Sequence, residues 1–156
     1  RPRVALFSTG DELTEPGEAL GSAAIYDANR AMLRALLARA GAEIADLGIL
    51  RDEAAGLEQR LRAAAAGGFP IALYNPCSRH RPDHLARACA ILMETLPAST
   101  VCGYVQNIGR DGQKSRVLTL GELVHEPLDM FTTVLIGNAE TQERFGRMLT
   151  PRGYRL

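Results

Sequence analysis

Six short apolar runs occur along the chain, each bounded by residues that favour turns. Glycine, asparagine, aspartate or proline beside a run of this length is typical of the end of a buried strand. The predicted strands cover residues 3–8, 43–48, 69–74, 100–106, 116–120 and 131–136. A polar tail containing Pro151 and Gly153 follows the last strand, and no element is predicted in it.

Three longer segments between these strands carry apolar residues at helical spacing. They predict helices over residues 27–40, 52–66 and 82–96. Asp27 and Asp52 suit N-caps, and Pro82 suits the first turn of the third helix. The side chains expected to face inward are Met32, Leu33, Leu36, Leu37 and Ala40, then Leu57, Leu61, Ala64 and Ala65, then Leu85, Cys89, Leu92 and Leu96.

Strands that alternate with helices specify an α/β protein. We predict one three-layer domain over residues 1–156, with a mostly parallel sheet of about six strands and an antiparallel portion near the C-terminus. In such sheets small-molecule ligands bind beyond the carboxyl ends of strands. The strand ends to consider are at residues 9–12, 74–76, 106–107 and 137–138.

Composition and charge exclude several classes of protein. Hydrophobic residues make up 46% of the 156 residues and charged residues 23%, values typical of globular proteins. Eighteen basic and eighteen acidic residues cancel, so we expect no nucleic-acid partner. No apolar run approaches the roughly 20 residues of a membrane span, so we expect no membrane partner and predict a cytoplasmic protein. Because the first residue is arginine, we expect an excised or engineered segment.

The cysteines predict free thiols, because an odd number without an export signal does not suit a disulfide framework. Cys77, His80, His84 and Cys89 are close in sequence and are residue types that bind zinc. However, Pro82 interrupts the segment, and Cys89 belongs to the inward face of the third helix. We therefore expect no zinc and no other metal, and Cys89 as a small buried hydrophobe.

The first part of the chain carries several motifs in order, namely Ser8-Thr9-Gly10-Asp11-Glu12-Leu13, Pro16-Gly17, Ile25-Tyr26-Asp27-Ala28-Asn29-Arg30 and Asp46-Leu47-Gly48-Ile49. On these motifs, residues 1 to about 66 resemble the molybdopterin-binding domain of the molybdopterin molybdenumtransferase family. The resemblance implies a molybdopterin cleft that contains Thr9, Gly10, Asp11, Glu12 and Asp27. The alternative is that Asp11 and Glu12 solvate a loop and that Asp27 caps a helix.

The next predicted strand departs from that family. The family has a Ser-Gly-Gly loop there, whose backbone N–H groups receive the phosphate end of the pterin, whereas this chain has Tyr74-Asn75-Pro76. Pro76 has no N–H group and a fixed φ, so the same anion cradle is not formed at this loop. Molybdopterin is therefore the second choice of cofactor.

The rest of the chain carries a longer set of motifs, namely Ile71-Ala72-Leu73-Tyr74-Asn75-Pro76, Ser78-Arg79, Asn107-Ile108-Gly109-Arg110-Asp111-Gly112, Thr132-Thr133-Val134-Leu135-Ile136-Gly137-Asn138 and the segment 146–154. Residues from about 57 to 156 resemble the C-terminal half of the precorrin-3B C(17)-methyltransferases, which belong to the tetrapyrrole methylases of cobalamin synthesis. The resemblance implies S-adenosylmethionine as cofactor and a binding site that contains Tyr74, Asn75, Ile136, Gly137 and Asn138.

Those residue types suit an adenosine site. Tyr74 and Ile136 can pack against an adenine, Gly137 permits close approach of the backbone, and Asn138 offers both a donor and an acceptor. The alternative is that ordinary turn chemistry accounts for these strand ends. No catalytic residue is predicted, because methyl transfer needs mainly alignment of the reacting atoms. Arg79 and Arg81 suit a tetrapyrrole carboxylate or, alternatively, a solvated surface.

The two resemblances overlap at the alanine-rich helix near residues 57–66, so we interpret the chain as a hybrid of segments 1–66 and 67–156 with one core. The family's glycine-rich cofactor loop has no counterpart in residues 1–56, so ligand binding without turnover is expected from a methyltransferase-like half-site. A molybdenum-cofactor module and a recombined fold without enzymatic activity are the alternatives. A missing parental strand would leave an open sheet edge, which favours a homodimer.

The strand order distinguishes these interpretations. If the strand at 69–74 lies beside the strand at 3–8, the topology is of the molybdopterin-binding type. If the C-terminal strands form a sheet of their own, the methyltransferase-like segment has kept its independence.

Overall fold

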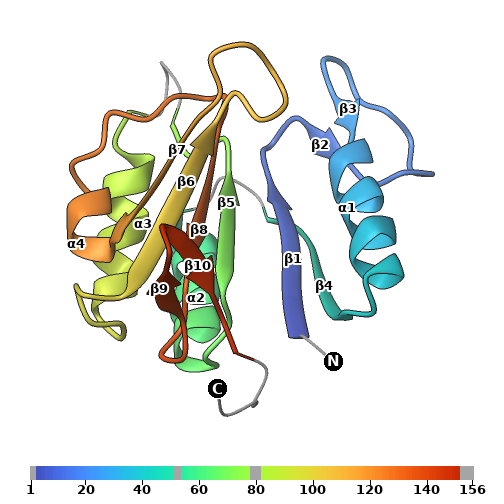
Figure 1. Ribbon diagram of the computed structural model, residues 1–156. Helices are drawn as coiled ribbons and strands as arrows, with labels where there is room; N and C mark the ends of the chain where they lie inside the picture. Colours follow the sequence, from blue (N-terminus) through green and yellow to red (C-terminus); the bar gives the residue numbers. More distant parts are fainter. Residues whose placement is uncertain (1–2, 51–53, 78–81, 152–156) are drawn as a thin grey trace. The chain divides into compact units, whose positions relative to one another are not determined.

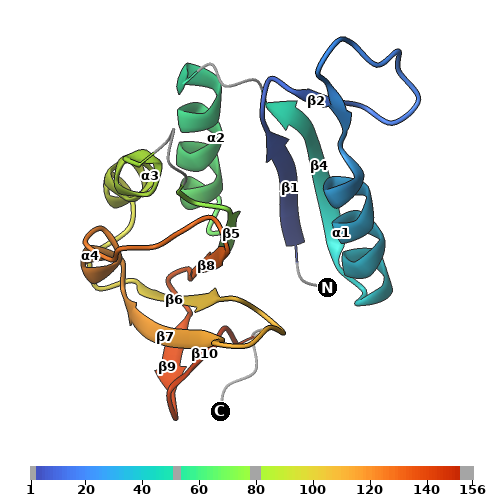
Figure 2. The same ribbon diagram turned by 90° about the horizontal axis from the view of Figure 1, so that it is seen from above.

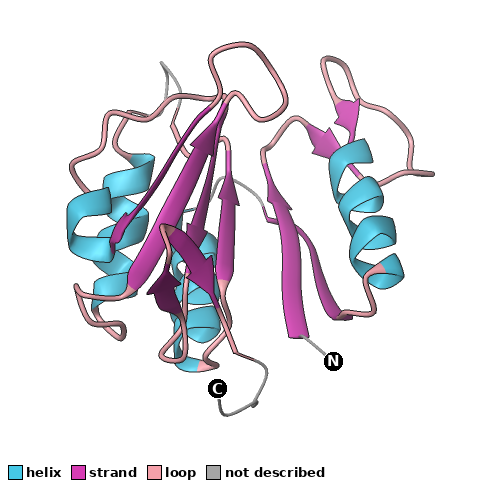
Figure 3. Ribbon diagram, viewed as in Figure 1, coloured by secondary structure: helices cyan, strands magenta, loops and turns pink. Residues whose placement is uncertain are grey.

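The computed structural model describes residues 3–50, 54–77 and 82–151. Helices and strands alternate along most of the chain, which confirms the α/β class (Figures 1 and 3). The chain divides into two compact units, Arg1–Arg60 and Leu61–Leu156. The division falls inside α2 (Ala54–Ala66), the helix in which the two sequence resemblances overlap.

The first unit contains a parallel pair of strands joined through a helix. β1 (Arg3–Thr9) pairs with β4 (Glu43–Leu50), and α1 (Ala28–Arg39) connects them in the sequence. Two short strands, β2 (Leu13–Thr14) and β3 (Ile25–Tyr26), form a second parallel pair within the intervening loop.

The apolar side of α1 is exposed, which corrects the expectation that it faces inward. Met32 is 55% exposed, Leu33 40% and Leu36 51%. The buried residue of the helix is Arg30, and Leu37, two turns further on the same face, is half-buried. The polar contacts of Arg30, rather than the apolar stripe, therefore decide which face of α1 turns inward.

The second unit contains a four-stranded sheet in which every neighbouring pair is antiparallel. The spatial order is β5 (Ile71–Tyr74), β8 (Thr132–Ile136), β6 (Val101–Gln106) and β7 (Lys114–Thr119). The antiparallel pairing of β6 with β7 is as predicted. The sheet differs from the mostly parallel one expected, because β8 returns between β5 and β6. The C-terminal strands thus form a sheet of their own.

The helices of this unit lie on one side of the sheet, and a hairpin lies on the other (Figure 2). Cys102 of β6 is buried on the helix side, whereas the next residue, Gly103, faces the hairpin residue Met148. A Cβ atom at Gly103 would lie 2.8 Å from the Met148 sulfur, so the hairpin packs closely because this position lacks a side chain. The buried apolar residues of this core include Leu61, Ala65, Leu85, Cys89, Leu92, Leu120, Leu123, Val134 and Ile136.

Most of the inward positions predicted for the second and third helices are confirmed. Leu61 and Ala65 of α2 are buried, as are Leu85, Cys89 and Leu92 of α3 (His84–Met93). These two helices bury the apolar stripes that their sequences carry, unlike α1.

Five short elements were not predicted from the sequence, namely β2, β3, one helix and the two strands of a hairpin. α4 (Leu120–Leu123) begins after a capping box, in which the Thr119 side chain accepts the Glu122 N–H and the Glu122 side chain accepts the Thr119 N–H. The sequence displays the Thr-x-x-Glu signature of this motif. β9 (Gln142–Arg144) and β10 (Arg147–Leu149) form a hairpin within the expected polar tail. Its turn, Phe145-Gly146, has positive φ at both residues, and phenylalanine is not a residue that normally indicates such a turn.

Candidate functional site

β5 and β6 end at the same edge of the second unit's sheet. Both are antiparallel to β8, which lies between them, so they are parallel to each other and their arrowheads point the same way (Figure 1). The carboxyl ends of parallel strands are where α/β proteins bind ligands. We call this edge the β5–β6 end and define it by residues 74–77, 106–113 and 129–133.

Two asparagines follow these strands in the same unusual conformation. Asn75 and Asn107 both have φ of +54°, in the left-handed region that asparagine tolerates better than most residues. The N–H of Asn75 donates to the carbonyl of Thr132 at 3.2 Å, and that of Asn107 donates to the carbonyl of Phe131 at 3.1 Å. The two turns thus hold consecutive carbonyls at the start of β8 from both sides, and backbone held in this way is often found at binding sites.

Asn75 also carries a buried acceptor that nothing satisfies. Its Oδ1 has no hydrogen-bond partner among the described residues. An unpaired buried acceptor costs about 1–3 kcal/mol, so a donor supplied by a ligand or water would be stabilising. Tyr74, one residue earlier, is 72% exposed. The structure therefore brings Tyr74 and Asn75 to the β5–β6 end, with an open aromatic ring beside an unpaired amide oxygen.

Asp129 fixes the loop that precedes β8. Its Oδ1 accepts from the Phe131 N–H at 3.0 Å and from the Thr132 hydroxyl at 2.8 Å, and its Oδ2 accepts from the Gln106 amide at 2.7 Å. Burial alone would raise the pKa of Asp129, but these hydrogen bonds outweigh it and lower the pKa. Asp129 therefore remains ionised as a positioning residue. Sequence reasoning missed it, although an aspartate shortly before a strand is a common turn signal.

Gly137 and Asn138 lie at the opposite end of the sheet from Tyr74. Ile136 pairs with Ile71 at the start of β5, whereas Tyr74 pairs with Thr133 at the start of β8. The five residues predicted from the methyltransferase resemblance therefore form two separate groups. The reason is the antiparallel course of β8, since strand ends meet at one edge only when strands run in the same direction.

Hydrogen bonds within the chain account for Asn138 at that opposite end. Its Nδ2 donates to the carbonyl of Gly68 at 2.9 Å, while its Oδ1 accepts from the Glu140 N–H and from the Thr141 hydroxyl. Thr141 is buried, and its Oγ1 lies 2.9 Å from that of Thr150. Asn138 thus ties the end of β8 to the turn before β5, as the turn-chemistry alternative expects.

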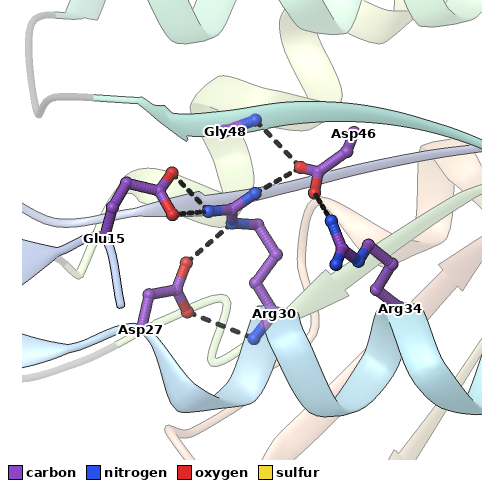
Figure 4. A network of polar contacts seen from close by, with 6 residues as sticks. All are labelled: Glu15, Asp27, Arg30, Arg34, Asp46 and Gly48. Atoms are coloured by element: carbon purple, nitrogen blue, oxygen red, sulfur yellow. Dashed lines mark hydrogen bonds and ion pairs between the residues drawn. The ribbon is translucent and has the colours of Figure 1, made fainter. Parts of the chain in front are cut away.

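The first unit contains a polar network centred on one buried arginine (Figure 4). The Arg30 guanidinium contacts the carboxylates of Asp27, Asp46 and Glu15, with the Nε donating to Asp27 Oδ2 at 2.8 Å. Asp27 caps α1, Asp46 belongs to β4 and Glu15 follows β2. The Nη1 atom of Arg34 lies 3.6 Å from Oδ2 of Asp46. This Arg30 network joins α1, β4 and the segment that follows β2.

The network keeps its acids charged. Burial would raise the pKa of Asp27, but hydrogen bonds from Arg30 and Ser8 outweigh it, so its pKa is lowered. The pKa of Asp46 is also lowered, because hydrogen bonds from Gly48 and Arg30 exceed the effect of burial. Burial would lower the pKa of Arg30, yet its bonds to Asp27, Asp46 and Glu15 raise it.

The residues predicted for a molybdopterin cleft lie close together in this unit. Thr9 ends β1, and Gly10 follows with φ of +143°. The Glu12 carboxylate folds against Gly10, where a Cβ would lie 2.5 Å from one of its oxygens. Asp11 and Glu12 are exposed, whereas Asp27 is buried as the cap of α1, which confirms the capping role considered for Asp27.

The cysteines and histidines form no metal-binding cluster in the described part of the chain. Within residues 3–50, 54–77 and 82–151, no three His, Cys, Asp or Glu side chains are placed to hold a metal ion, while His80, Arg79 and Arg81 lie outside those ranges. Cys89 and Cys102 are free thiols in the core. Burial raises the pKa of Cys89 to about 11 and that of Cys102 to about 12, so both stay protonated. No described helix is long and apolar enough to cross a membrane.

Comparisons with known proteins match both resemblances. A family model described as a probable molybdopterin binding domain matches residues 5–73. A molybdopterin molybdenumtransferase of Haemophilus influenzae is 45% identical over 62 residues, which cover 40% of this chain and 15% of that protein. A probable cobalt-factor III C(17)-methyltransferase of Salmonella typhimurium is 43% identical over 100 residues, 64% of this chain and 42% of that protein.

A solved structure extends the second likeness to three dimensions. The crystal structure of the methyltransferase CobJ aligns with a TM-score of 0.59 and 29% sequence identity, covering 81% of this chain and 65% of that chain. The chain spans about two fifths of the length of the Salmonella typhimurium methyltransferase that it matches.

The Asn138 turn predicts a stability effect for Gly137→Ala. An added Cβ would lie 2.5 Å from the Thr141 Cβ, so Thr141 must move and its bonds to Asn138 weaken. We expect a loss of roughly 1–3 kcal/mol in the free energy of unfolding, measured by denaturant titration. Gly21→Ala is the control, because its nearest neighbour would be 3.9 Å away. Equal stability of the Gly137→Ala variant and the original chain would contradict this role.

The Arg30 network predicts pH-dependent stability of the first unit. Because the pKa values of Asp27 and Asp46 are lowered on folding, their contribution is present above their unfolded values and is lost as the pH falls through the folded ones. Arg30→Gln should cost roughly 3 kcal/mol near neutral pH, because it leaves a buried carboxylate unpaired. The cost should shrink as the pH falls below 3.8, the ordinary pKa of an aspartate, and these acids become protonated.

Amide hydrogen exchange of β4 measures this stability. Arg39→Gln is the matched control, since Arg39 is exposed on the same helix and its side chain forms no hydrogen bond or ion pair within the described residues. A cost of Arg30→Gln that does not change with pH would show that the carboxylates are not what Arg30 stabilises.

Proposed function

We propose that the second unit binds the adenosine end of S-adenosylmethionine at the β5–β6 end, as one lobe of a precorrin-type C(17)-methyltransferase. The identity to the Salmonella typhimurium methyltransferase and the likeness to CobJ support the family of this proposal. The sheet supports this location, since β5 and β6 run in the same direction and their carboxyl ends coincide. This placement replaces the five-residue site inferred from the sequence with one that retains Tyr74 and Asn75.

The unpaired Oδ1 of Asn75 is the observation that carries the proposal. An adenosine offers an exocyclic amine and ribose hydroxyls, all of which donate hydrogen bonds to such an acceptor. The exposed ring of Tyr74 offers an apolar surface for the base. Asn107 and Gln106 border the same edge, and Asp129 holds Gln106 in place.

The cofactor supplies an activated methyl group when bound, and the residues of this edge bind and orient it. Asn75 and Asn107 hold the start of β8 through backbone hydrogen bonds, so the site has a fixed frame. No acid or base of this chain is assigned to the reaction, because alignment is the main requirement of methyl transfer. We expect binding without turnover by these residues, which match two fifths of the relative's length.

Calorimetric titration with S-adenosylhomocysteine, the demethylated cofactor, tests the proposal. The original chain should release or absorb heat with one-site stoichiometry, and Asn75→Gly should bind roughly tenfold more weakly because the acceptor is lost. Glycine retains the positive φ, so the turn should still form. Phe145→Gly is the matched control, since Phe145 also has φ of +54° but lies in the hairpin turn. No binding at millimolar ligand would overturn the proposal.

A molybdopterin-binding module is the second candidate, favoured by the family model over residues 5–73. In this alternative the turn Thr9–Glu12 lines the cleft, and Asp27 stays committed to Arg30. Glu12→Ala should then weaken molybdopterin binding severalfold in a fluorescence titration, whereas Glu43→Ala, which removes an exposed acid of β4, should not. Unaltered molybdopterin binding by Glu12→Ala would count against this candidate. A stable monomer that binds neither molybdopterin nor S-adenosylhomocysteine would favour the third alternative, a recombined fold without activity.

A further inference from the structure

In the second unit, the Arg110 guanidinium lies over an aromatic ring, whereas those of Arg62 and Arg116 form ion pairs. Its guanidinium carbon lies 5.7 Å from the centre of the Phe131 ring, in cation–π range. Arg62 pairs with Glu94, and Arg116 pairs with Glu122 and Glu126. Within the described residues, the Arg110 guanidinium has no hydrogen bond and no ion pair. Its N–H groups are therefore available, although the side chain is held over a ring.

The neighbouring described acids, Asp111 and Asp129, form no ion pair with Arg110. Asp129, two residues before Phe131, accepts from Gln106, Thr132 and the backbone of Phe131 with its two oxygens. Asp111 follows Arg110 directly in the sequence, and no ion pair joins the two within the described residues. No acid in the described part of the chain therefore pairs with the positive charge of Arg110.

That place is the β5–β6 end. The Phe131 carbonyl accepts the N–H of Asn107, and the next carbonyl, of Thr132, accepts the N–H of Asn75. The loop that carries Arg110 begins at Asn107, whose carbonyl accepts the Arg110 N–H at 3.0 Å. Phe131 is 51% exposed, so the stacked pair is open to solvent beside the proposed adenosine site.

We propose that Arg110, held over Phe131, binds a carboxylate of the ligand that occupies the β5–β6 end. A guanidinium held over the face of a ring by a cation–π contact does not spend its N–H groups on that ring, and these groups match the two oxygens of a carboxylate. Holding the side chain on Phe131 also reduces the conformational entropy lost on binding. The inference rests on the proposed function for the identity of the ligand and makes Arg110 a specificity-determining residue of that site.

The carboxylate has two sources. One is the amino-acid end of the cofactor, and the other is an acidic side chain of a polycarboxylate macrocycle of the kind that precorrin methyltransferases modify. The two sources are distinguished by ligand pairs that differ in carboxylates. S-adenosylhomocysteine carries the amino-acid end, whereas 5′-methylthioadenosine lacks it. Uroporphyrin is an octacarboxylate, whereas deuteroporphyrin is a dicarboxylate.

The experiment measures the affinity of all four ligands for the original chain and for Arg110→Ala, Arg110→Lys and Arg147→Ala. Arg147 is the control, because it is an exposed arginine of β10. If the cofactor supplies the carboxylate, Arg110→Ala should weaken S-adenosylhomocysteine binding on the order of tenfold and leave 5′-methylthioadenosine unchanged. If the macrocycle supplies the carboxylate, Arg110→Ala should weaken the binding of uroporphyrin more than the binding of deuteroporphyrin. In either case Arg110→Lys should recover only part of the affinity, and added salt should reduce the difference.

The outcomes separate this inference from the proposed function. If the original chain binds S-adenosylhomocysteine and Arg110→Ala binds every ligand equally well, the inference is overturned and the proposed function stands. If the original chain fails to bind S-adenosylhomocysteine but binds uroporphyrin in an Arg110-dependent way, the proposed function fails and the carboxylate site stands. An equal loss in Arg147→Ala, or no binding of any ligand, overturns the inference.

Discussion

The position of β8 between β5 and β6 is the constraint on which the second unit depends. Because β8 runs antiparallel to both neighbours, it makes β5 and β6 parallel to each other and brings their carboxyl ends to one edge. The same arrangement sends Gly137 and Asn138 to the other edge. The position of this one strand in the sheet therefore decides which loops form a candidate site and which serve as turns of the fold.

The two edges of this sheet differ in how their polar groups are used. At the end of the sheet that carries Asn138, the amide nitrogen of Asn138 donates to Gly68 and the amide oxygen accepts from Glu140 and Thr141, so both atoms are engaged within the chain. At the β5–β6 end, the Asn75 amide oxygen and the Arg110 guanidinium have no hydrogen-bond partner among the residues that the structure describes. Unused hydrogen-bonding groups on a rigid frame are what a ligand can use, because pairing them costs little further ordering.

The first unit is held together on different principles. Among its described residues the buried side chains are the polar ones of Asp27 and Arg30, and the exposed Met32 and Leu36 of α1 are not what fixes the helix. The buried Arg30 instead draws Asp27, Asp46 and Glu15 into one network, which sets the rotation of the helix. Such a network stabilises one geometry only while its acids are charged, since an unpaired buried charge is costly. The motif Asp27-Ala28-Asn29-Arg30 therefore has a structural explanation that does not require a ligand.

The sequence by itself determined the α/β class, the positions of most strands, the capped start of α1 and the inward faces of α2 and α3. These features depend on residues near each other in the chain, such as Asp27 with Arg30 or Leu61 with Ala65. The Thr119–Glu122 capping box was equally local, and the sequence contained it. The tertiary structure alone decided that β8 lies between β5 and β6, that Arg30 rather than Leu36 is buried, and that Arg110 meets Phe131. Those contacts join residues distant in the chain, and local pattern does not specify which distant partners meet or in which direction a strand returns.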